Sequence, residues 1–436
     1  MKLQVRIIAP VVLAIICAGT LATFLWWQLS QSTLLLQRSA SEQEVTIDTN
    51  SDVISTTVLT DPRDQALFHL RQGDMLAVRN EWAGAAAQYE QAVEAGGGLP
   101  ALRKMAQAQL QRRDMKGVQE TIKKMKKEGA RAEDLLLLES IVALRKGELV
   151  QTKSLLENAD DSPQKEYGLS LLSIIEGNHT AAREHLDNVI NGWEPVLRTY
   201  ARTLVAAYQE FELFSESQNI HLVTLLSRAL AQVQECELAL PLLIQVTQTK
   251  GDYRDAWIVQ GYCELSTERP EQALASLEQA YNIDPQKPEV QYFLGRAYEE
   301  TGDLANANTF FRYALANGFR PESEIRRSIA KIEYSIGNVS EALQQYEVLT
   351  SLPDASLESF HGYITTSVEA GKTEEAFYMA QKAVEKYPDD PSAYELLGWA
   401  AMEADKIEEA REALETALEM SPFLEGAKDK LKQLDD

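Results

Sequence analysis

Apolar residues recur at helical spacing from about residue 64 onward, in pairs of short segments separated by brief polar turns. Apolar positions three or four residues apart place their side chains on one face of an amphipathic helix. Several turns contain a glycine, as in 300–303 (ETGD) and 369–372 (EAGK), and glycine is favoured just after a helix ends. The pattern predicts an all-α chain built from consecutive helical hairpins.

The hairpins repeat at a fixed interval in the second half of the chain. A small residue returns every 34 or 35 residues in the second helix of each hairpin, at Ala239, Ala273, Ala307, Ala342, Ala376 and Ala410. Such self-similarity is the signature of a solenoid, in which no unit can bury its apolar face alone and each unit stacks on the next.

Other positions keep step with these alanines. We expect small residues in the first helix to let the two helices of a hairpin approach closely. We expect large apolar residues in the second helix to fill the space between units, and proline to end that helix and begin the next unit. The residues of these three kinds are Gly261, Gly295, Gly398, Leu277, Phe311, Leu414, Pro285, Pro388 and Pro422.

Together these positions closely resemble the tetratricopeptide repeat (TPR) consensus, W-x2-L-G-x2-Y…A-x3-F…A…P, across residues 254–422. The units at 323–356 and 357–390 match less well, because Ala330 and Ile364 stand where the consensus has glycine. The resemblance implies a right-handed TPR superhelical solenoid. It is carried by Trp257, Gly261, Ala280, Leu294, Gly295, Tyr298, Ala307, Phe311, Ala314, Tyr394, Leu397, Gly398, Ala410, Leu414, Ala417 and Pro422.

The period also divides the chain. A C-terminal TPR array is predicted at 220–422, and a degenerate N-terminal set of TPR units at 64–191. Residues 192–219 break the period and read as one long helix around 196–208 without an obvious partner, so we interpret them as an irregular helical seam. The amphipathic stretch after Pro422 predicts a capping helix at 423–436, which a solenoid needs to cover its last apolar face.

The N-terminal region has a different pattern. Residues 7–29 (IIAPVVLAIICAGTLATFLWWQL) contain no charge, and as a helix they would be about 35 Å long, enough to cross a bilayer core. Because Lys2 and Arg6 precede this stretch and acidic residues follow it, the positive-inside rule places residues 1–6 in the cytoplasm. We therefore predict a single transmembrane signal-anchor helix at 7–29, a flexible linker at 30–63 and an extracytoplasmic TPR domain.

Two alternatives to a signal anchor are a cleaved signal peptide and a lipoprotein modified at Cys17. Both fit less well, because Ile16 occupies a position at which each of those signals has a small residue. The apolar sequence also continues well past this point.

The charge distribution is uneven. The chain carries a formal net charge of −24, which opposes binding to nucleic acid. Residues 100–131 nevertheless hold ten basic against three acidic residues, a net +7 that could meet anionic lipid, an acidic partner, an acidic polymer or the acidic C-terminal units of a second copy. The alternative is that these basic residues cluster by chance on a solvent-exposed helix pair and bind nothing. The ten residues are Arg103, Lys104, Arg112, Arg113, Lys116, Lys123, Lys124, Lys126, Lys127 and Arg131.

The sequence contains none of the common catalytic or cofactor motifs, such as GxGxxG, a P-loop, HExxH or GxSxG. The three cysteines form no CxxC pair, which argues against a structural metal site. The sequence leaves undecided whether Cys236 and Cys263 form a disulfide. We therefore expect a protein that is not an enzyme and that has no cofactor.

Resemblance to TPR proteins implies a concave groove lined by the second, fifth, ninth and twelfth positions of each first helix. Aromatic residues and arginine at such positions are typical of interface centres. The carboxylate clamp of some TPR domains is not reproduced, because Glu289, Glu324 and Glu358 occupy second positions. The candidate groove residues are Tyr262, Tyr292, Arg296, Arg327, Lys331, Tyr334, His361 and Trp399.

The combined expectation is a non-catalytic, membrane-anchored TPR scaffold of the bacterial cell envelope, which binds a peptide or helix of other membrane-complex proteins. Membrane-anchored TPR proteins commonly accompany assembly, secretion, cell-wall or polysaccharide machinery. The alternative is a carbohydrate-binding TPR module of exopolysaccharide machinery, which an extended row of aromatic faces would favour. The observed mixture of Tyr, Arg and Glu favours peptide.

Overall fold

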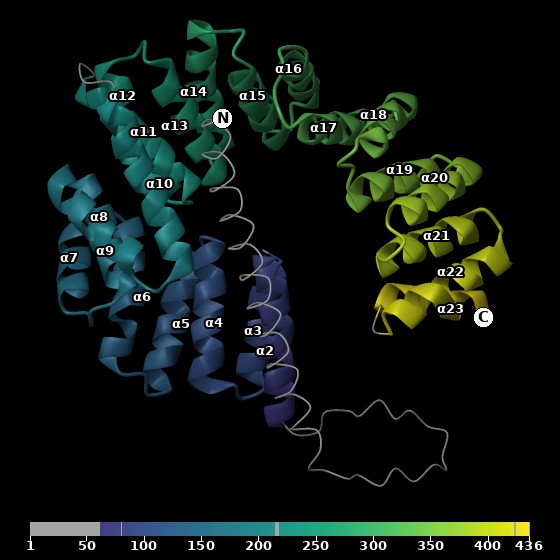
Figure 1. The fold of residues 1–436 in the computed structure, drawn as a ribbon, viewed down its shortest axis with the longest axis horizontal. Coiled ribbons are helices and arrows are strands. Elements are labelled where there is room, and N and C mark those ends of the chain that lie inside the picture. The colour runs from purple at the N-terminus through teal and green to yellow at the C-terminus, as the bar shows by residue number, and fades with distance from the viewer. Residues whose placement is uncertain (1–61, 80, 214–217, 423, 436) are drawn as a thin grey trace, which may run out of the picture. The chain divides into compact units, whose positions relative to one another are not determined.

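The computed structural model describes residues 62–79, 81–213, 218–422 and 424–435. Within these residues the chain forms 22 helices, α2 to α23, and no strand (Figure 1). None of the described helices is both long enough and apolar enough to cross a membrane. The predicted membrane helix at 7–29 and most of the predicted linker at 30–63 lie outside the described residues. Residues Ala66–Asp436 form one compact unit.

Eight helices, α2 to α9, and the single helix α10 precede the regular array. Their bounds are α2 (Pro62–Val78), α3 (Trp82–Glu94), α4 (Gly98–Gln111), α5 (Met115–Lys127), α6 (Ala132–Arg145), α7 (Leu149–Glu157), α8 (Pro163–Ile175), α9 (His179–Asn191) and α10 (Pro195–Glu212). The array and its last helix are α11 (Asn219–Gln232), α12 (Cys236–Thr249), α13 (Arg254–Ser266), α14 (Pro270–Ile283), α15 (Pro288–Glu300), α16 (Leu304–Ala316), α17 (Glu322–Ser335), α18 (Val339–Ser351), α19 (Leu357–Glu369), α20 (Thr373–Lys386), α21 (Pro391–Glu403), α22 (Ile407–Met420) and α23 (Glu425–Asp435).

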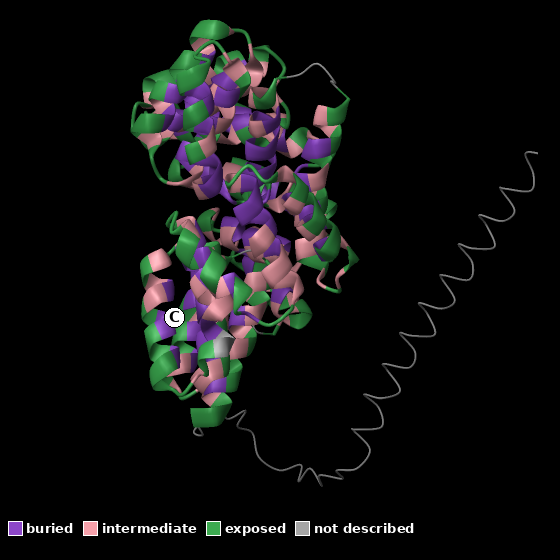
Figure 2. Cartoon of the chain, turned by 90° about the vertical axis from the view of Figure 1, so that its left-hand side faces the viewer, coloured by how far each residue is buried: buried purple, intermediate pink, exposed green. Residues whose placement is uncertain are grey.

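Successive helices pack side by side as hairpins, and each hairpin contacts the next along the chain. All six of the periodic alanines, from Ala239 to Ala410, have no exposed surface. Buried positions concentrate where helices face one another, while the turns and outer faces are exposed (Figure 2). The structure therefore confirms the all-helical solenoid that the repeat predicts.

Close approach within a hairpin depends on the predicted glycines. A methyl group added at Gly295 would lie 2.6 Å from Cδ1 of Phe311, and one added at Gly261 would lie 2.4 Å from Cγ of Leu277. These large side chains thus rest on the glycine of their own hairpin, which refines the prediction that they fill the space between units. Phe311 does both, because it also joins Ile325 of the following helix α17 in one core cluster.

The turns follow the glycine pattern of the sequence. Gly302 and Gly371, in the two turns singled out above, have φ angles of 84° and 72°. This left-handed conformation is costly for residues with a side chain and open to glycine. The backbone amides of both residues bond to helix carbonyls three positions earlier, so these turns end α15 and α19 tightly.

Helix α10 is the odd helix between two sets of hairpins. It extends beyond the predicted 196–208, and it has partners, since it packs against both α9 and α11. Ala201 and Leu204 of α10 are fully buried in a core cluster that reaches from α6 to α13. The apolar core therefore continues through the region predicted as a seam.

A set of polar contacts connects helices far apart in the sequence, and we call it the bridge. Arg145 at the end of α6 pairs with Glu235 at the α11–α12 turn, with both N–O distances at 3.2 Å. Arg113, in the α4–α5 turn, donates to the carbonyl of Gln234 at 2.7 Å and forms an ion pair with Glu237. The bridge holds the first hairpins against the α11–α12 turn, across a separation of 90 or more residues.

The last helix covers the end of the array. Helix α23 packs against α22 and α21, and its Ala427 is fully buried. Leu431 and Leu434 of α23 pack against the core cluster that contains Leu414. The helix predicted after Pro422 is therefore present and covers the apolar face of the final hairpin.

Candidate partner-binding groove

Two adjoining cavities lie along the first helices of the C-terminal hairpins. The first, of about 350 Å³, lies between α17 and α19, and the second, of about 590 Å³, lies among α19, α21 and α23. Glu358 and His361 of α19 line both cavities, so they form one continuous surface, which we call the groove. The spacing of first-helix positions puts these residues on one face because residues three or four apart are neighbours on a helix.

Five of the eight predicted residues line the groove. Arg327, Lys331 and Tyr334 of α17 line the first cavity, Trp399 of α21 lines the second, and His361 lines both. The rings of His361 and Trp399 are 6.3 Å apart and tilted by 30°. The structure thus brings these residues together, while their role in binding remains a prediction.

The other three predicted residues lie elsewhere. Tyr292 is only 7% exposed, stacks on Phe319 at 4.2 Å and donates a hydrogen bond to Glu324 at 3.1 Å. Its assignment to a binding surface is therefore wrong, since the ring is part of the core. The spacing of residues identifies the helix face of Tyr292 but not whether another side chain covers that face. Here Phe319, in the turn after α16, covers the ring.

Arg296 and Tyr262 remain partly exposed but do not line either cavity. Arg296 pairs with Glu300 one turn further along α15 at 3.1 Å. The ring of Tyr262 packs edge-on against Phe293 at 5.5 Å. These contacts are those of a helix surface, and neither side chain joins the groove formed by α17 to α23.

Charges of both signs alternate along the groove. Arg327 pairs with Glu358 at 3.0 Å, and Lys430 of α23 pairs with Glu395 of α21 at 2.8 Å. The hydroxyl of Tyr334 bonds to Glu369, and this carboxylate raises the pKa of Tyr334 above its ordinary value. The Nε–H of Arg327 is buried and has no partner among the described residues. Donors, acceptors and an aromatic pair are thus all present on one surface.

Among the groove residues that the sequence analysis missed are two charged ones, Glu395 and Lys430. Glu395 is at the fifth position of its repeat, as Arg327 and His361 are. The repeat pattern could therefore have predicted that Glu395 lines the groove. Lys430 belongs to α23, which follows the last repeat, and no repeat position points to it. It was therefore visible only once α23 had been placed against α21.

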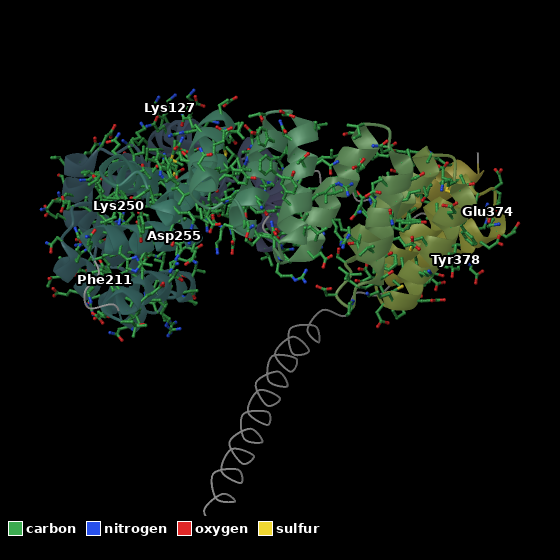
Figure 3. The ribbon with its side chains drawn as sticks, turned by 90° about the horizontal axis from the view of Figure 1, so that it is seen from above. Lys127, Phe211, Lys250, Asp255, Glu374 and Tyr378 are labelled. Atoms are coloured by element: carbon green, nitrogen blue, oxygen red, sulfur yellow. The ribbon has the colours of Figure 1, made fainter. Side chains whose placement is uncertain are left out.

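The predicted basic patch lies mainly on α4 and α5. Eight of its ten residues are exposed, including Lys127, which is labelled in Figure 3. Lys104 pairs with Asp74 at 2.6 Å, and Lys126 pairs with Glu139 at 2.7 Å. Arg113 does not belong to the surface patch, because its guanidinium is engaged in the bridge.

Cys236 and Cys263 are both buried free thiols. Burial raises the pKa of the Cys263 thiol, and the neighbouring Cys236 raises it further. Such thiols behave as small apolar side chains and are poorly reactive. The disulfide left open in the sequence is not formed in this structure.

Comparison with known proteins agrees with the repeat geometry. Profiles of the tetratricopeptide repeat match residues 224–288, and also 264–332 and 367–427. These ranges include the predicted Gly261, Gly295 and Gly398 units. The chain therefore contains tetratricopeptide repeats, and its described part is an all-helical TPR solenoid.

Two curated relatives match a limited stretch. The Superkiller complex protein 3 of Mus musculus and that of Homo sapiens are each 27% identical to this chain over 157 residues. The match covers 35% of this chain and only 10% of the length of each relative.

Several solved TPR structures are similar in part. YrrB, described as a TPR protein with an unusual peptide-binding site, is 18% identical, with a TM-score of 0.37, covering 44% of this chain and 97% of its own. The type IV pilus biogenesis factor PilW is 18% identical, with a TM-score of 0.40, covering 49% and 99%. A TPR protein from Parabacteroides merdae is 17% identical, with a TM-score of 0.35, covering 63% and 99%.

Proposed function

We propose that this protein is a non-catalytic scaffold whose groove binds an extended or helical segment of another protein. The observation that carries the proposal is the pair of adjoining cavities on α17, α19, α21 and α23, which bring together Arg327, Lys331, His361, Trp399 and Lys430. TPR solenoids act as surfaces for other proteins, because stacked hairpins leave a long ordered face that no single unit could form.

The chemistry of the groove favours a polypeptide. A peptide backbone offers both donors and acceptors, and the groove offers both in alternation, from Arg327 to Glu395. The tilted His361–Trp399 pair suits one apolar or aromatic side chain. The carbohydrate alternative needs a longer row of exposed rings, and the burial of Tyr292 removes one aromatic residue from the candidate surface.

A site-specific photo-crosslinker tests the groove. With the crosslinker in place of His361, we expect capture of a defined protein whose yield falls about tenfold when Trp399→Ala is added, because a central aromatic contributes roughly 1–3 kcal/mol. The matched control is Tyr378→Ala, an exposed aromatic on the second helix α20 (Figure 3), which should leave the yield unchanged.

Capture that is equally strong with Trp399→Ala would contradict the groove proposal. A glycan array run with the same variants separates the alternative. Glycan binding that Trp399→Ala abolishes, without any protein captured from position 361, would identify carbohydrate as the occupant.

The same proposal places the scaffold in a bacterial cell envelope, as a single-pass membrane protein with its TPR domain outside the cytoplasm. Its support is the uncharged stretch at 7–29, preceded by Lys2 and Arg6 and followed by acidic residues. Alkaline phosphatase fused after residue 63 should be active, and the intact protein should stay in the membrane after alkaline carbonate washing. Inactive fusions would contradict the orientation, and a mature mass well below 48.7 kDa would indicate cleavage.

A further inference from the structure

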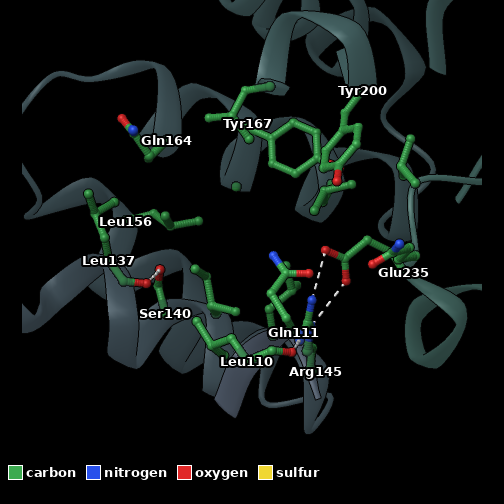
Figure 4. Close-up of a pocket in the computed structure, with 17 residues that line it drawn as sticks. Leu110, Gln111, Leu137, Ser140, Arg145, Leu156, Gln164, Tyr167, Tyr200 and Glu235 are labelled. Carbon is green, nitrogen blue, oxygen red and sulfur yellow. Dashed lines mark hydrogen bonds and ion pairs between the residues drawn. The ribbon is translucent and has the colours of Figure 1, made fainter. Parts of the chain in front are cut away.

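Another cavity, separate from the two that form the groove, lies inside the bridged region. It has a volume of about 170 Å³ and is formed by α4, α6, α7, α8, α10 and the α11–α12 turn (Figure 4). Leucine side chains supply much of its wall, among them Leu137, Leu156 and Leu171, and Val233 closes it from the turn. A cavity of comparable size and apolar lining, about 150 Å³, is able to bind benzene.

One buried polar atom of the wall is left without a partner among the described residues. Tyr167 is 8% exposed, and its buried hydroxyl forms no hydrogen bond with any described residue. Figure 4 shows its ring beside that of Tyr200, at a centroid distance of 6.2 Å. Because an unpaired buried hydroxyl costs about 1–3 kcal/mol, a ligand group that accepts a hydrogen bond from it would be stabilised at this position.

Three of the neighbouring polar side chains, Ser140, Arg145 and Glu235, are already engaged. Ser140 donates to the carbonyl of Leu137 at 2.7 Å. Arg145 directs two donors to Glu235 and a third to the carbonyl of Leu110 at 3.0 Å. Since the guanidinium and carboxylate neutralise each other, the wall offers no free charge to compensate a charged ligand. The cavity therefore favours a neutral occupant.

We propose that this cavity is a binding site for a small neutral molecule of about the size of a substituted benzene, with one oxygen that accepts a hydrogen bond from Tyr167. Leu137, Leu156 and Leu171 contact its apolar body. Because the α11–α12 turn closes the cavity, the ligand stabilises the bridge by binding only when that turn is in place.

The test measures thermal unfolding of the full chain in detergent micelles with three probes. 4-Methylphenol has the proposed size and an oxygen, toluene lacks the oxygen, and benzoate carries a charge. We expect 4-methylphenol to raise the unfolding midpoint more than toluene does, and benzoate to have no effect. Because micelles take up each probe equally in every sample, differences between variants report on the cavity.

Three variants make the test specific. Tyr167→Phe removes only the hydroxyl, and it should lower the apparent affinity for 4-methylphenol about two- to tenfold, the effect of one hydrogen bond, with toluene unchanged. Leu171→Phe fills the cavity and should abolish the response to both aromatic probes. Tyr208→Phe is the control, because this buried hydroxyl lies outside the cavity, against His179.

The proposal is overturned if no probe shifts the wild-type midpoint, or if Leu171→Phe keeps the full response, since the probes would then bind elsewhere. An unchanged preference for 4-methylphenol over toluene in Tyr167→Phe overturns the role of the hydroxyl. Circular dichroism of each variant establishes that helicity is intact before the midpoints are compared.

Discussion

The bridged region, from α4 to α12, and the rest of the regular array, from α13 to α22, are built from the same kind of hairpin but are held together differently. In the array, each helix contacts only its near neighbours along the chain. In the bridged region, α6 also contacts α12, and Arg145 meets Glu235 across 90 residues of sequence. The array is thus stabilised by a series of local contacts, while the bridged region depends on a few distant ones.

This difference separates two kinds of site. The groove lies on the array, where each first helix presents side chains at repeated positions to the same surface. The internal cavity lies in the bridged region, where the α11–α12 turn closes over the first hairpins. Repetition therefore provides an open surface, and the departure from repetition at α10 is accompanied by a more sheltered cavity.

The largest expected effect comes from breaking the bridge. Arg145→Ala should lower the free energy of unfolding by about 3–5 kcal/mol, because it leaves the carboxylate of Glu235 buried without a counter-charge. The two side chains are only 12% and 11% exposed. Urea unfolding measures the loss, and hydrogen exchange should locate it at the α11–α12 turn.

The control for this prediction is the double variant Arg145→Met with Glu235→Leu. Replacing both charges by apolar groups of similar size should recover most of the stability, since neither charge is then left alone. If the double variant is as unstable as Arg145→Ala, the loss comes from packing and the bridge is not an electrostatic contact.

Within the array, the next largest effect is expected at Glu333, and it depends on pH. This side chain, 6% exposed, accepts hydrogen bonds from Asn308, Arg312 and Asn338 at 2.7–2.8 Å. Burial alone would raise its pKa, but these three donors outweigh burial and hold the pKa below its ordinary value of 4.5. A lowered carboxylate pKa stabilises the fold above pH 4.5, and this stabilisation is lost as pH falls through the folded-state pKa.

Glu333→Gln should therefore cost about 1.5–3 kcal/mol at pH 7, the range for hydrogen bonds to a charged group. The difference from wild type should narrow as the pH falls below 4.5, measured by urea unfolding at pH 7, 5 and 3. Glu358→Gln, at an exposed ion pair, is the comparison and should show a smaller change. A pH-independent cost at Glu333 would contradict the assignment.

A smaller effect is expected from crowding one hairpin. Gly295→Ala places a methyl group 2.6 Å from the ring of Phe311 and should cost about 1–3 kcal/mol, the usual range for overpacking. Adding Phe311→Leu should recover part of the loss by making room. Because the array is held by local contacts, hydrogen exchange should change in α15 to α17 only, and a change that reaches the bridge would contradict the comparison.

The smallest effect is expected at an exposed ion pair inside the bridged region. Arg228 of α11 pairs with Glu210 of α10, and these side chains are 46% and 42% exposed. Arg228→Ala should change the free energy of unfolding by about 0–1 kcal/mol, because water screens such pairs. A loss as large as that of Arg145→Ala would show that burial is not what distinguishes the bridge.

The sequence predicted the repeated contacts well and the distant contacts poorly. Gly295 and Phe311 are 16 residues apart in one hairpin, and their meeting follows from the repeat pattern alone. Tyr292 was assigned to the right helix face but to the wrong depth, because Phe319 covers it. Arg113 was assigned to the basic surface patch, although its guanidinium bonds to the carbonyl of Gln234 and pairs with Glu237.

The sequence by itself determined the helical hairpins, their period of 34 or 35 residues, the close approach at Gly261 and Gly295, and the helix face that lines the groove. Only the tertiary structure decided which side chains of that face are exposed, that Arg145 meets Glu235, and that Tyr167 faces a cavity. The physical reason is range. Helix periodicity positions residues within one hairpin, whereas contacts across 90 residues depend on the summed rotations of all the hairpins between them.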